Sequence, residues 1–180
     1  MNEQILPRKF YNQETAIVAR ELLGKYLIRK IGKKKLIAEI IETEAYVGPE
    51  DAASHSRFGE TGRNKVMFGP AGHAYVYLIY GTYHCLNIST REVGFGAAVL
   101  LRAARPVKNI TQKMSGPGLL CLALNIDRSL NGTDMTKRDG LYILNNGEKN
   151  NNKEVFIGPR VGIAYAGEWR DKPLRFRLNV

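Results

Sequence analysis

The segment Lys35–Tyr46, KLIAEIIETEAY, ends in a carboxylate that has the surroundings of a general base. Glu44 lies two residues before Tyr46 and is followed by the Gly48-Pro49 turn and, on the next loop, by His55. A carboxylate that loses part of its hydration becomes more basic and can take a proton from water. Glu44 is therefore the candidate catalytic residue. The commoner role of such residues is that of solvated charges on an edge strand, which would apply equally to Glu39 and Glu42.

A second cluster consists of tyrosines on either side of a glycine turn: Tyr75, Tyr77, Tyr80 and Tyr83. Aromatic faces stack on nucleobases and attract cationic rings. In a regular strand Tyr77 and Tyr80 would lie on opposite faces, so that one could line a cavity while the other projects outward. Ordinary packing of aromatic residues within a sheet would also account for this cluster.

The formal net charge of +10 predicts a polyanionic partner, either nucleic acid or an anionic membrane surface. Charge alone does not distinguish the two. Basic residues recur near the segments described above, as a phosphate-binding face requires, although each is individually more often a solvated surface charge. These residues are Arg57, Arg63, Lys65, Arg102, Arg105, Arg160, Arg170, Lys172, Arg175 and Arg177.

Other residue types argue against several classes of protein. The three histidines lack the tight spacing of metal ligands, so neither a metal site nor a cofactor is expected. Cys85 and Cys121 are expected to be buried free thiols. No apolar run reaches the roughly 18 residues that span a bilayer, and the amino terminus has no signal-peptide pattern. We therefore expect a cytoplasmic protein without a membrane partner.

The elements that must position these side chains indicate one α+β domain over residues 1–180, built around an antiparallel sheet. A helix is predicted from Asn12 to Gly24, and a strand over Lys35–Tyr46 in which Ile40, Glu42, Glu44 and Tyr46 share a face. A hairpin turns at Gly81-Thr82, Ala97–Ala104 is a central strand, and Gly116-Pro117-Gly118 precedes a short helix. The polar region Asn125–Glu154 is predicted to be loop-like, and strand-like alternation returns at the end of the chain.

Five blocks of sequence closely resemble the alkyladenine (3-methyladenine) DNA glycosylase family, and they follow in the right order over nearly the whole chain. They are IETEAYVGPEDAASHS (41–56), RNKVMFGPAGHAYVYLIYGTYHCLNIS (63–89), VLLRAARP (99–106), SGPGLLCLALNI (115–126) and RVGIAYAGEWRDKPLRF (160–176). The resemblance implies a curved antiparallel sheet, flanking helices and a protruding β-hairpin that enters the minor groove of DNA. It also implies a monomeric base excision repair enzyme without lyase activity that acts on double-stranded DNA containing damaged purines, in the cytoplasm and, in a bacterium, at the nucleoid.

The resemblance also assigns roles to individual residues. Glu44 matches the general base that activates water, and Tyr80 matches the wedge that fills the gap left by a flipped nucleotide. The base pocket would comprise Tyr46, His55, Tyr77, Asn87 and Arg102, in which Asn87 disfavours the exocyclic amino group of guanine. Arg57, Arg63 and Lys65 are the candidate contacts to the DNA backbone. The chain departs from the family pattern at Leu119 and Leu122, where a lysine and a glutamine are usual, which puts one phosphate contact in doubt.

Two other classes of function remain open from the sequence. A catalytically silent nucleic-acid-binding domain would keep the basic face and the aromatic hairpin, and a peripheral membrane protein would rest on net charge alone. Release of a base from alkylated duplex DNA separates the glycosylase from both. The sequence does not rank 3-methyladenine, 7-methylguanine, hypoxanthine and ethenoadenine as substrates.

Overall fold

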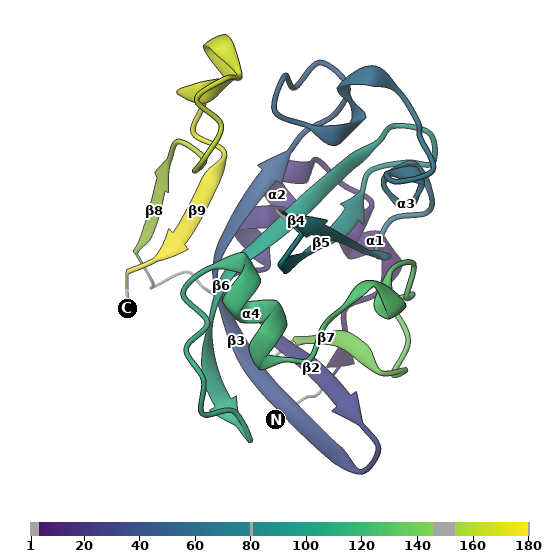
Figure 1. The fold of residues 1–180 in the computed structure, drawn as a ribbon, viewed down its shortest axis with the longest axis vertical. Helices are drawn as coiled ribbons and strands as arrows, with labels where there is room; N and C mark the ends of the chain where they lie inside the picture. Colours follow the sequence, from purple (N-terminus) through teal and green to yellow (C-terminus); the bar gives the residue numbers. More distant parts are fainter. Residues whose placement is uncertain (1–3, 80, 146–153, 180) are drawn as a thin grey trace.

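The structure is a computed structural model that describes residues 4–79, 81–145 and 154–179 (Figure 1). Its strands are β1 (Gln4–Ile5), β2 (Tyr26–Ile31), β3 (Lys34–Tyr46), β4 (Ala74–Ile79), β5 (Tyr83–Thr90), β6 (Ala97–Lys108), β7 (Leu141–Asn145), β8 (Val155–Gly158) and β9 (Arg175–Leu178). Its α-helices are α1 (Arg8–Tyr11), α2 (Thr15–Glu21), α3 (Lys65–Phe68) and α4 (Pro117–Ala123), and its 3₁₀ helices include η1 (His55–Phe58), η2 (Arg128–Leu130) and η4 (Gly167–Arg170).

These strands form one curled antiparallel sheet in the order β1-β7-β2-β3-β6-β5-β4 (Figure 1). The long strand β3 pairs with β6 on one side, whereas on the other side it pairs first with β2 and then with β9. Strand β8 extends the sheet by pairing with β9. The predicted α+β architecture is confirmed, as are the β4–β5 hairpin and the central position of β6 between β3 and β5.

A pair of irregularities in the β3–β6 ladder decides which way Glu44 points. The Cα partners step from Ile40↔Ala104 to Glu42↔Ala103 and then to Thr43↔Leu101, which leaves Ile41 and Arg102 without a partner in this ladder. An extra residue in a strand turns the side chains that follow it to the other face. Ile40 consequently lies in the main core, while Glu44 faces the opposite side. The prediction that these two residues share a face was therefore wrong.

The main hydrophobic core lies between one face of the sheet and the helices α2 and α4. Helix α2 begins at Thr15 because Asn12 instead ends the short helix α1. The Thr43 hydroxyl donates to the Ala19 carbonyl at 2.7 Å and so ties β3 to α2. Helix α4 begins after Gly116, as predicted, and packs closely on the hairpin: a Cβ at Gly118 would lie 2.8 Å from the Tyr83 ring.

Strand β7 is the element that sequence reasoning missed. It lies within the polar region predicted to be loop-like, yet its residues LYILN pair with both β1 and β2 and are largely buried. The segment NNGEKNNNKE (145–154) is the part predicted to be most loop-like, and its residues 146–153 lie outside the described residues. No helix in the described part of the chain has the length and apolar character needed to cross a membrane.

Candidate active site

Glu44 stands near the end of β3, and both of its carboxylate oxygens have hydrogen-bond partners. Its Oε1 atom accepts the backbone N–H of Val161 at 2.8 Å, and Oε2 accepts the hydroxyl of Tyr46 at 3.0 Å. The guanidinium of Arg102 lies 3.5 Å from Oε1. The exposed fraction of the Glu44 side chain is 0%, so this glutamate is not a solvated surface charge.

Burial raises the pKa of the Glu44 carboxyl. The positive charges of Arg102 and Arg160 and the hydrogen bonds from Val161 and Tyr46 lower it, but they do not outweigh the loss of hydration. A carboxylate with a raised pKa is a stronger base than an ordinary glutamate. The shift is in the direction expected of a general base.

A cavity of about 260 Å³ adjoins this carboxylate. It is slightly smaller than the roughly 300 to 1,000 Å³ of pockets for drug-sized ligands, which suits a single flat ring system. All the predicted pocket residues line it: Tyr46, His55, Tyr77, Asn87 and Arg102, which come from β3, η1, β4, β5 and β6. Sequence positions spread over 57 residues are thereby brought to one concave surface.

Glu44 itself lies directly behind the cavity wall rather than in it. Its three partners Tyr46, Arg102 and Val161 line the cavity, and together they cover the carboxylate. In this arrangement water does not reach the carboxylate. A displacement of one partner, such as the Tyr46 hydroxyl, is needed to open it to the cavity.

Another wall of the cavity consists of uncharged aromatic and amide side chains, those of His55, Tyr75, Tyr77 and Asn87. The Nδ1 atom of His55 lies 2.9 Å from the hydroxyl of Tyr75, and its ring packs edge-on against Tyr77 at a centroid distance of 4.7 Å. Partial burial and the nearby charges of Arg63 and Arg57 lower the pKa of His55, which favours the neutral imidazole.

Burial also raises the pKa of Tyr75 to about 12 and that of Tyr77 above its usual range, so both hydroxyls keep their protons. Asn87 is buried, and its Nδ2 donates to the Tyr75 carbonyl at 3.3 Å. This wall therefore offers hydrogen-bonding groups that carry no net charge.

A buried ion pair between Arg160 and Asp51, which sequence reasoning missed, lies close to the Glu44 carboxylate. Arg160 was predicted as part of a phosphate-binding face, but it is only 5% exposed and therefore cannot serve there. Its guanidinium donates to Asp51 Oδ1 at 2.8 Å and to the Ala45 carbonyl at 2.9 Å, and it lies over the Tyr46 ring at 4.7 Å. Residue type does not distinguish a buried arginine from an exposed one, so only the tertiary structure reveals this pair.

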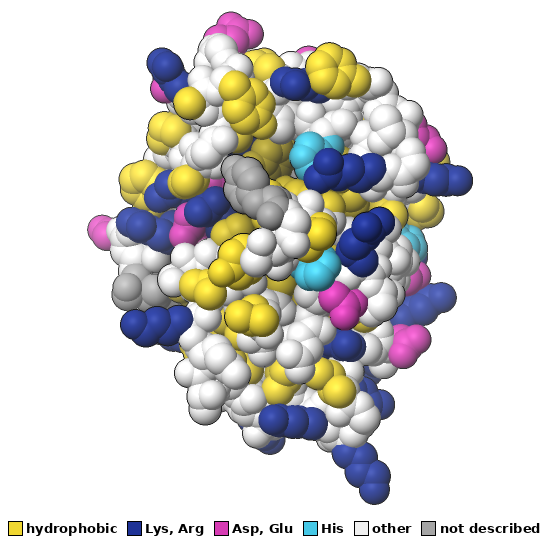
Figure 2. Space-filling view, viewed as in Figure 1, with side chains coloured by type: hydrophobic (Ala, Val, Ile, Leu, Met, Phe, Trp, Pro, Cys, Tyr) yellow, Lys and Arg dark blue, Asp and Glu magenta, His cyan; other side chains and the backbone are white. Residues whose placement is uncertain are grey.

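Several of the remaining basic residues form ion pairs with glutamates of β3. Arg105 pairs with Glu39, and both Arg102 and Arg175 pair with Glu42. The alternative in which these glutamates are solvated charges is therefore wrong, since each is buried or half-buried and paired. Figure 2 shows further Lys and Arg side chains spread between hydrophobic ones on the face drawn there.

The candidate backbone contacts lie at the mouth of the cavity or beside it. Arg63 lines the cavity with its guanidinium 5.3 Å from the Tyr77 ring, Arg57 lies on η1, and Lys65 begins α3; all three are exposed. Leu119 and Leu122 of α4 are exposed as well. Tyr80, the predicted wedge, lies outside the described residues. Within the described ranges, His, Cys, Asp and Glu do not gather in a group of three that could hold a metal ion.

Comparison with known proteins identifies the family. The family model for methylpurine-DNA glycosylase matches residues 9–180. Relatives named "Putative 3-methyladenine DNA glycosylase" include one from Legionella pneumophila (strain Corby), 51% identical over 97% of this chain and 94% of its own length. Others come from Anaeromyxobacter dehalogenans (strain 2CP-1), 49% identical over 97% and 82%, and Methanocella arvoryzae, 45% identical over 96% and 91%. The chain therefore belongs to the methylpurine-DNA glycosylase family.

Proposed function

We propose that this protein releases damaged purines from duplex DNA by hydrolysing the N-glycosidic bond with water activated by Glu44. Family membership makes it a DNA glycosylase that acts on DNA containing damaged bases in repair. The observation that carries the finer proposal is the buried Glu44 carboxylate, held by groups that themselves line a cavity of about the size of one base. We also propose, from the family resemblance, that the protein acts as a monomer.

Base flipping is the first step of the proposed reaction. The glycosidic bond of a stacked base is out of reach, so the nucleotide must leave the duplex and its base must enter the cavity. The rings of Tyr46 and Tyr77 would receive the purine, and alkylated purines that carry a positive charge are attracted to such rings. Asn87, from its buried position in the lining, would disfavour guanine through the exocyclic amino group.

Hydrolysis then needs a water molecule between Glu44 and the sugar. We propose that water replaces the Tyr46 hydroxyl at Oε2, while Val161 and Arg102 keep the carboxylate in place. The water oxygen bonds to the anomeric carbon, its proton passes to Glu44, and the electrons of the breaking C–N bond leave with the purine. The negative charge of Glu44 also stabilises the oxocarbenium-like sugar. A neutral purine such as hypoxanthine must gain a proton or hydrogen bonds as it departs.

The wedge role of Tyr80 stays a proposal that rests on the resemblance alone. An inserted aromatic ring would fill the vacated position in the stack and so slow the return of the nucleotide. We expect Tyr80→Ser to reduce the flipped population, measured with a fluorescent lesion in the duplex. An unchanged flipping equilibrium would remove this role.

The decisive experiment is single-turnover release of base from duplexes that each carry one lesion: 3-methyladenine, 7-methylguanine, hypoxanthine or ethenoadenine. We expect free base and an intact abasic strand. No lysine lines the cavity among the described residues, so a Schiff base is not expected and borohydride should trap no covalent adduct. Binding without base release would instead favour a silent binding domain, and a trapped adduct would show a lyase activity.

A further inference from the structure

A second, shallower pocket opens beside the base cavity. It has a volume of about 200 Å³ and lies between η1, the Thr61–Asn64 turn and Tyr165. The two pockets share Ala53, His55, Arg63 and Tyr165 as lining residues. Because the strand that delivers a flipped nucleotide must enter and leave the base cavity at its rim, a pocket on that rim is where a neighbouring nucleotide would lie.

Two aromatic side chains at this pocket are unusually exposed. Phe58 is 81% exposed and Tyr165 is 66% exposed, the highest fractions among the aromatic residues in the described part of the chain. Large aromatic rings contribute strongly to binding when a partner covers them. A base is a suitable partner, because every base has a flat π-face that stacks on an aromatic ring.

Phe58 lies on the same short helix as His55, which lines the base cavity. It ends the 3₁₀ helix η1, which begins at His55, and side chains three residues apart in a 3₁₀ helix eclipse one another. The turn is fixed at its start by the Ser54 side chain, which accepts the N–H of Ser56 at 3.2 Å. The Asn64 amide fixes it further by donating to the His55 carbonyl at 2.9 Å. Phe58 therefore projects from the same side of this turn as His55.

The pocket carries positive charge without a compensating carboxylate. The Arg57 guanidinium lies 4.5 Å from the Phe58 ring centroid and 5.8 Å from that of Tyr165, and it is anchored by donating to the Ala52 carbonyl at 2.6 Å. Arg63 lines the same pocket, and no acidic residue is among its described lining residues. Two cations beside an exposed ring complement a nucleotide, which combines a phosphate with a flat base.

We propose that this pocket binds the nucleotide next to the flipped one on the damaged strand. Its base lies against Phe58 and its phosphate faces Arg57 and Arg63. This subsite rests on the proposed base-flipping function, since it shares its rim with the base cavity. It would strengthen the capture of damaged DNA without taking part in the chemical step.

The test measures single-turnover base release as a function of protein concentration for Phe58→Ala and the unsubstituted protein. Phe58→Ala should raise the half-saturating concentration about 5- to 10-fold, in the lower part of the range for loss of one stacked base, with an unchanged maximal rate. Phe58→Trp, which keeps a stacking face, should restore it. Ile17→Ala is the matched control, because Ile17 is 47% exposed but lies on α2, across the sheet from the cavity.

Truncated substrates locate the effect. Duplexes are prepared in which the damaged strand ends directly at the lesion, either on its 5′ or on its 3′ side. On one of the two, Phe58→Ala and the unsubstituted protein should become equal, because the stacked nucleotide is gone. An unchanged half-saturating concentration for Phe58→Ala, or a loss that persists on both truncated duplexes, would overturn the subsite while base release itself continues. Absence of base release by the unsubstituted protein would instead refute the proposed function.

Discussion

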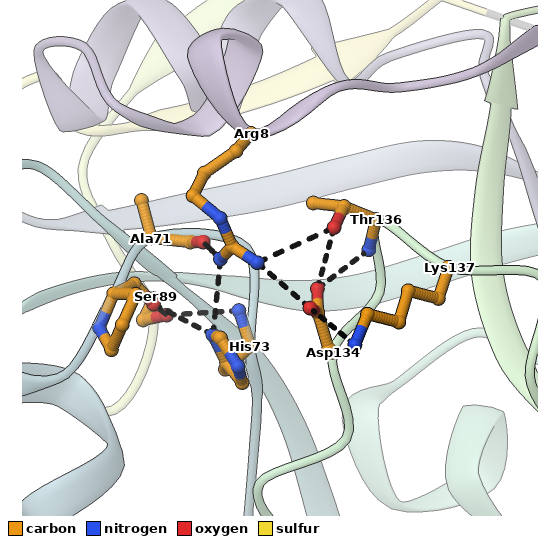
Figure 3. Close-up of polar contacts among 8 residues, drawn as sticks. Arg8, Ala71, His73, Ser89, Asp134, Thr136 and Lys137 are labelled. Atoms are coloured by element: carbon orange, nitrogen blue, oxygen red, sulfur yellow. Dashed lines mark hydrogen bonds and ion pairs between the residues drawn. The ribbon is translucent and has the colours of Figure 1, made fainter.

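Two carboxylates of this protein, Glu44 in the candidate site and Asp134 in the scaffold, have opposite electrostatic environments. Asp134 lies in a polar cluster that Figure 3 shows in close-up. It accepts the guanidinium of Arg8 at 2.7 Å and the hydroxyl and N–H of Thr136 at 2.6 and 3.1 Å, and Lys137 lies 3.8 Å away. Partial burial would raise the pKa of Asp134, but the hydrogen bonds from Thr136 and the charge of Arg8 outweigh burial and hold it below its usual range.

The cluster around Asp134 joins distant segments. Arg8 also donates to the Ala71 carbonyl and lies 3.4 Å from Nδ1 of His73, so helix α1 is connected to the loop before β4 and to the segment around Asp134 (Figure 3). Arg8 and Thr136 together donate enough hydrogen bonds to Asp134 to replace the water that its carboxylate loses on partial burial. Glu44 has fewer donors for its complete burial, and its pKa rises instead. The two carboxylates thus differ in how fully hydrogen bonds and charges replace lost hydration, and the less compensated one, Glu44, is the proposed base.

The largest expected effect is on catalysis. Glu44→Gln should reduce single-turnover base excision by about 100- to 10,000-fold, because an amide cannot accept the water's proton. Binding of lesion DNA should be kept. The matched substitution in the scaffold, Asp134→Asn, should leave the excision rate of the folded protein unchanged. Undiminished excision by Glu44→Gln would refute its assignment as general base.

The second largest effect concerns the ion pair behind the cavity. Asp51→Ala leaves Arg160 buried and unpaired, which should lower the free energy of unfolding by about 3 to 5 kcal/mol. The control is Asp171→Ala, whose partner Arg170 is exposed to solvent, so that loss of this surface pair should leave the free energy of unfolding nearly unchanged. Urea unfolding of the two variants measures the difference. Equal stabilities would mean that the buried pair contributes no more than a surface pair.

A smaller expected effect is a difference between Asp134 and Glu44 in how each changes the free energy of unfolding with pH. The depressed pKa of Asp134 contributes stability above the unfolded value of about 3.9, and this contribution is lost as the pH falls through the folded pKa. Asp134→Asn should therefore lower the free energy of unfolding at pH 7, with a smaller loss in acid.

The pKa of Glu44 is shifted in the opposite direction, so its effect on stability has the opposite dependence on pH. Its raised pKa contributes stability below the unfolded value of about 4.3, which is lost as the pH rises through the folded pKa. Glu44→Gln should therefore be as stable as the unsubstituted protein at pH 7 or more so. Unfolding measured from pH 4 to 8 tests both signs, and a loss of stability at pH 7 for both variants would contradict the contrast.

The smallest expected effect concerns the donor that covers Glu44. Tyr46→Phe keeps the ring but removes a hydrogen bond to the charged carboxylate, so the pKa of Glu44 should rise further. Excision requires the ionised form, and at sub-saturating protein concentrations its rate reports the pKa of the free protein, in which this hydrogen bond is intact. The acid limb of that pH–rate profile should therefore move to higher pH by about one unit or less. The same profile for Tyr142→Phe, a buried tyrosine in a separate cluster, serves as the control. A limb that does not move would show that the hydroxyl has no part in setting the basicity of Glu44.

Local patterns predicted much of the fold, whereas the five pocket residues were predicted from the family resemblance. The hairpin around Gly81, the strand Ala97–Ala104 and the helix after Gly116 follow from turn residues and β-branched runs, and all are present. Strand β7 was missed because its polar flanks dominate the local composition, whereas its stability comes from pairing with β1 and β2. The prediction that a helix begins at Asn12 was wrong, because Asn12 ends the short helix α1 and helix α2 begins at Thr15.

The amino-acid sequence by itself determined the family, the sheet-based architecture and, through the family resemblance, five of the side chains that line the cavity. Only the tertiary structure decided that Glu44 faces away from Ile40, that Arg160 is buried on Asp51 and that the carboxylate lies behind the cavity wall. The orientation of the Glu44 side chain depends on an extra residue in each of the paired strands β3 and β6. The pKa of Glu44 depends on burial by segments distant in the sequence, such as β9 and the loop that contains Val161. Such effects arise from contacts between segments far apart in the chain, which no local pattern of residues encodes.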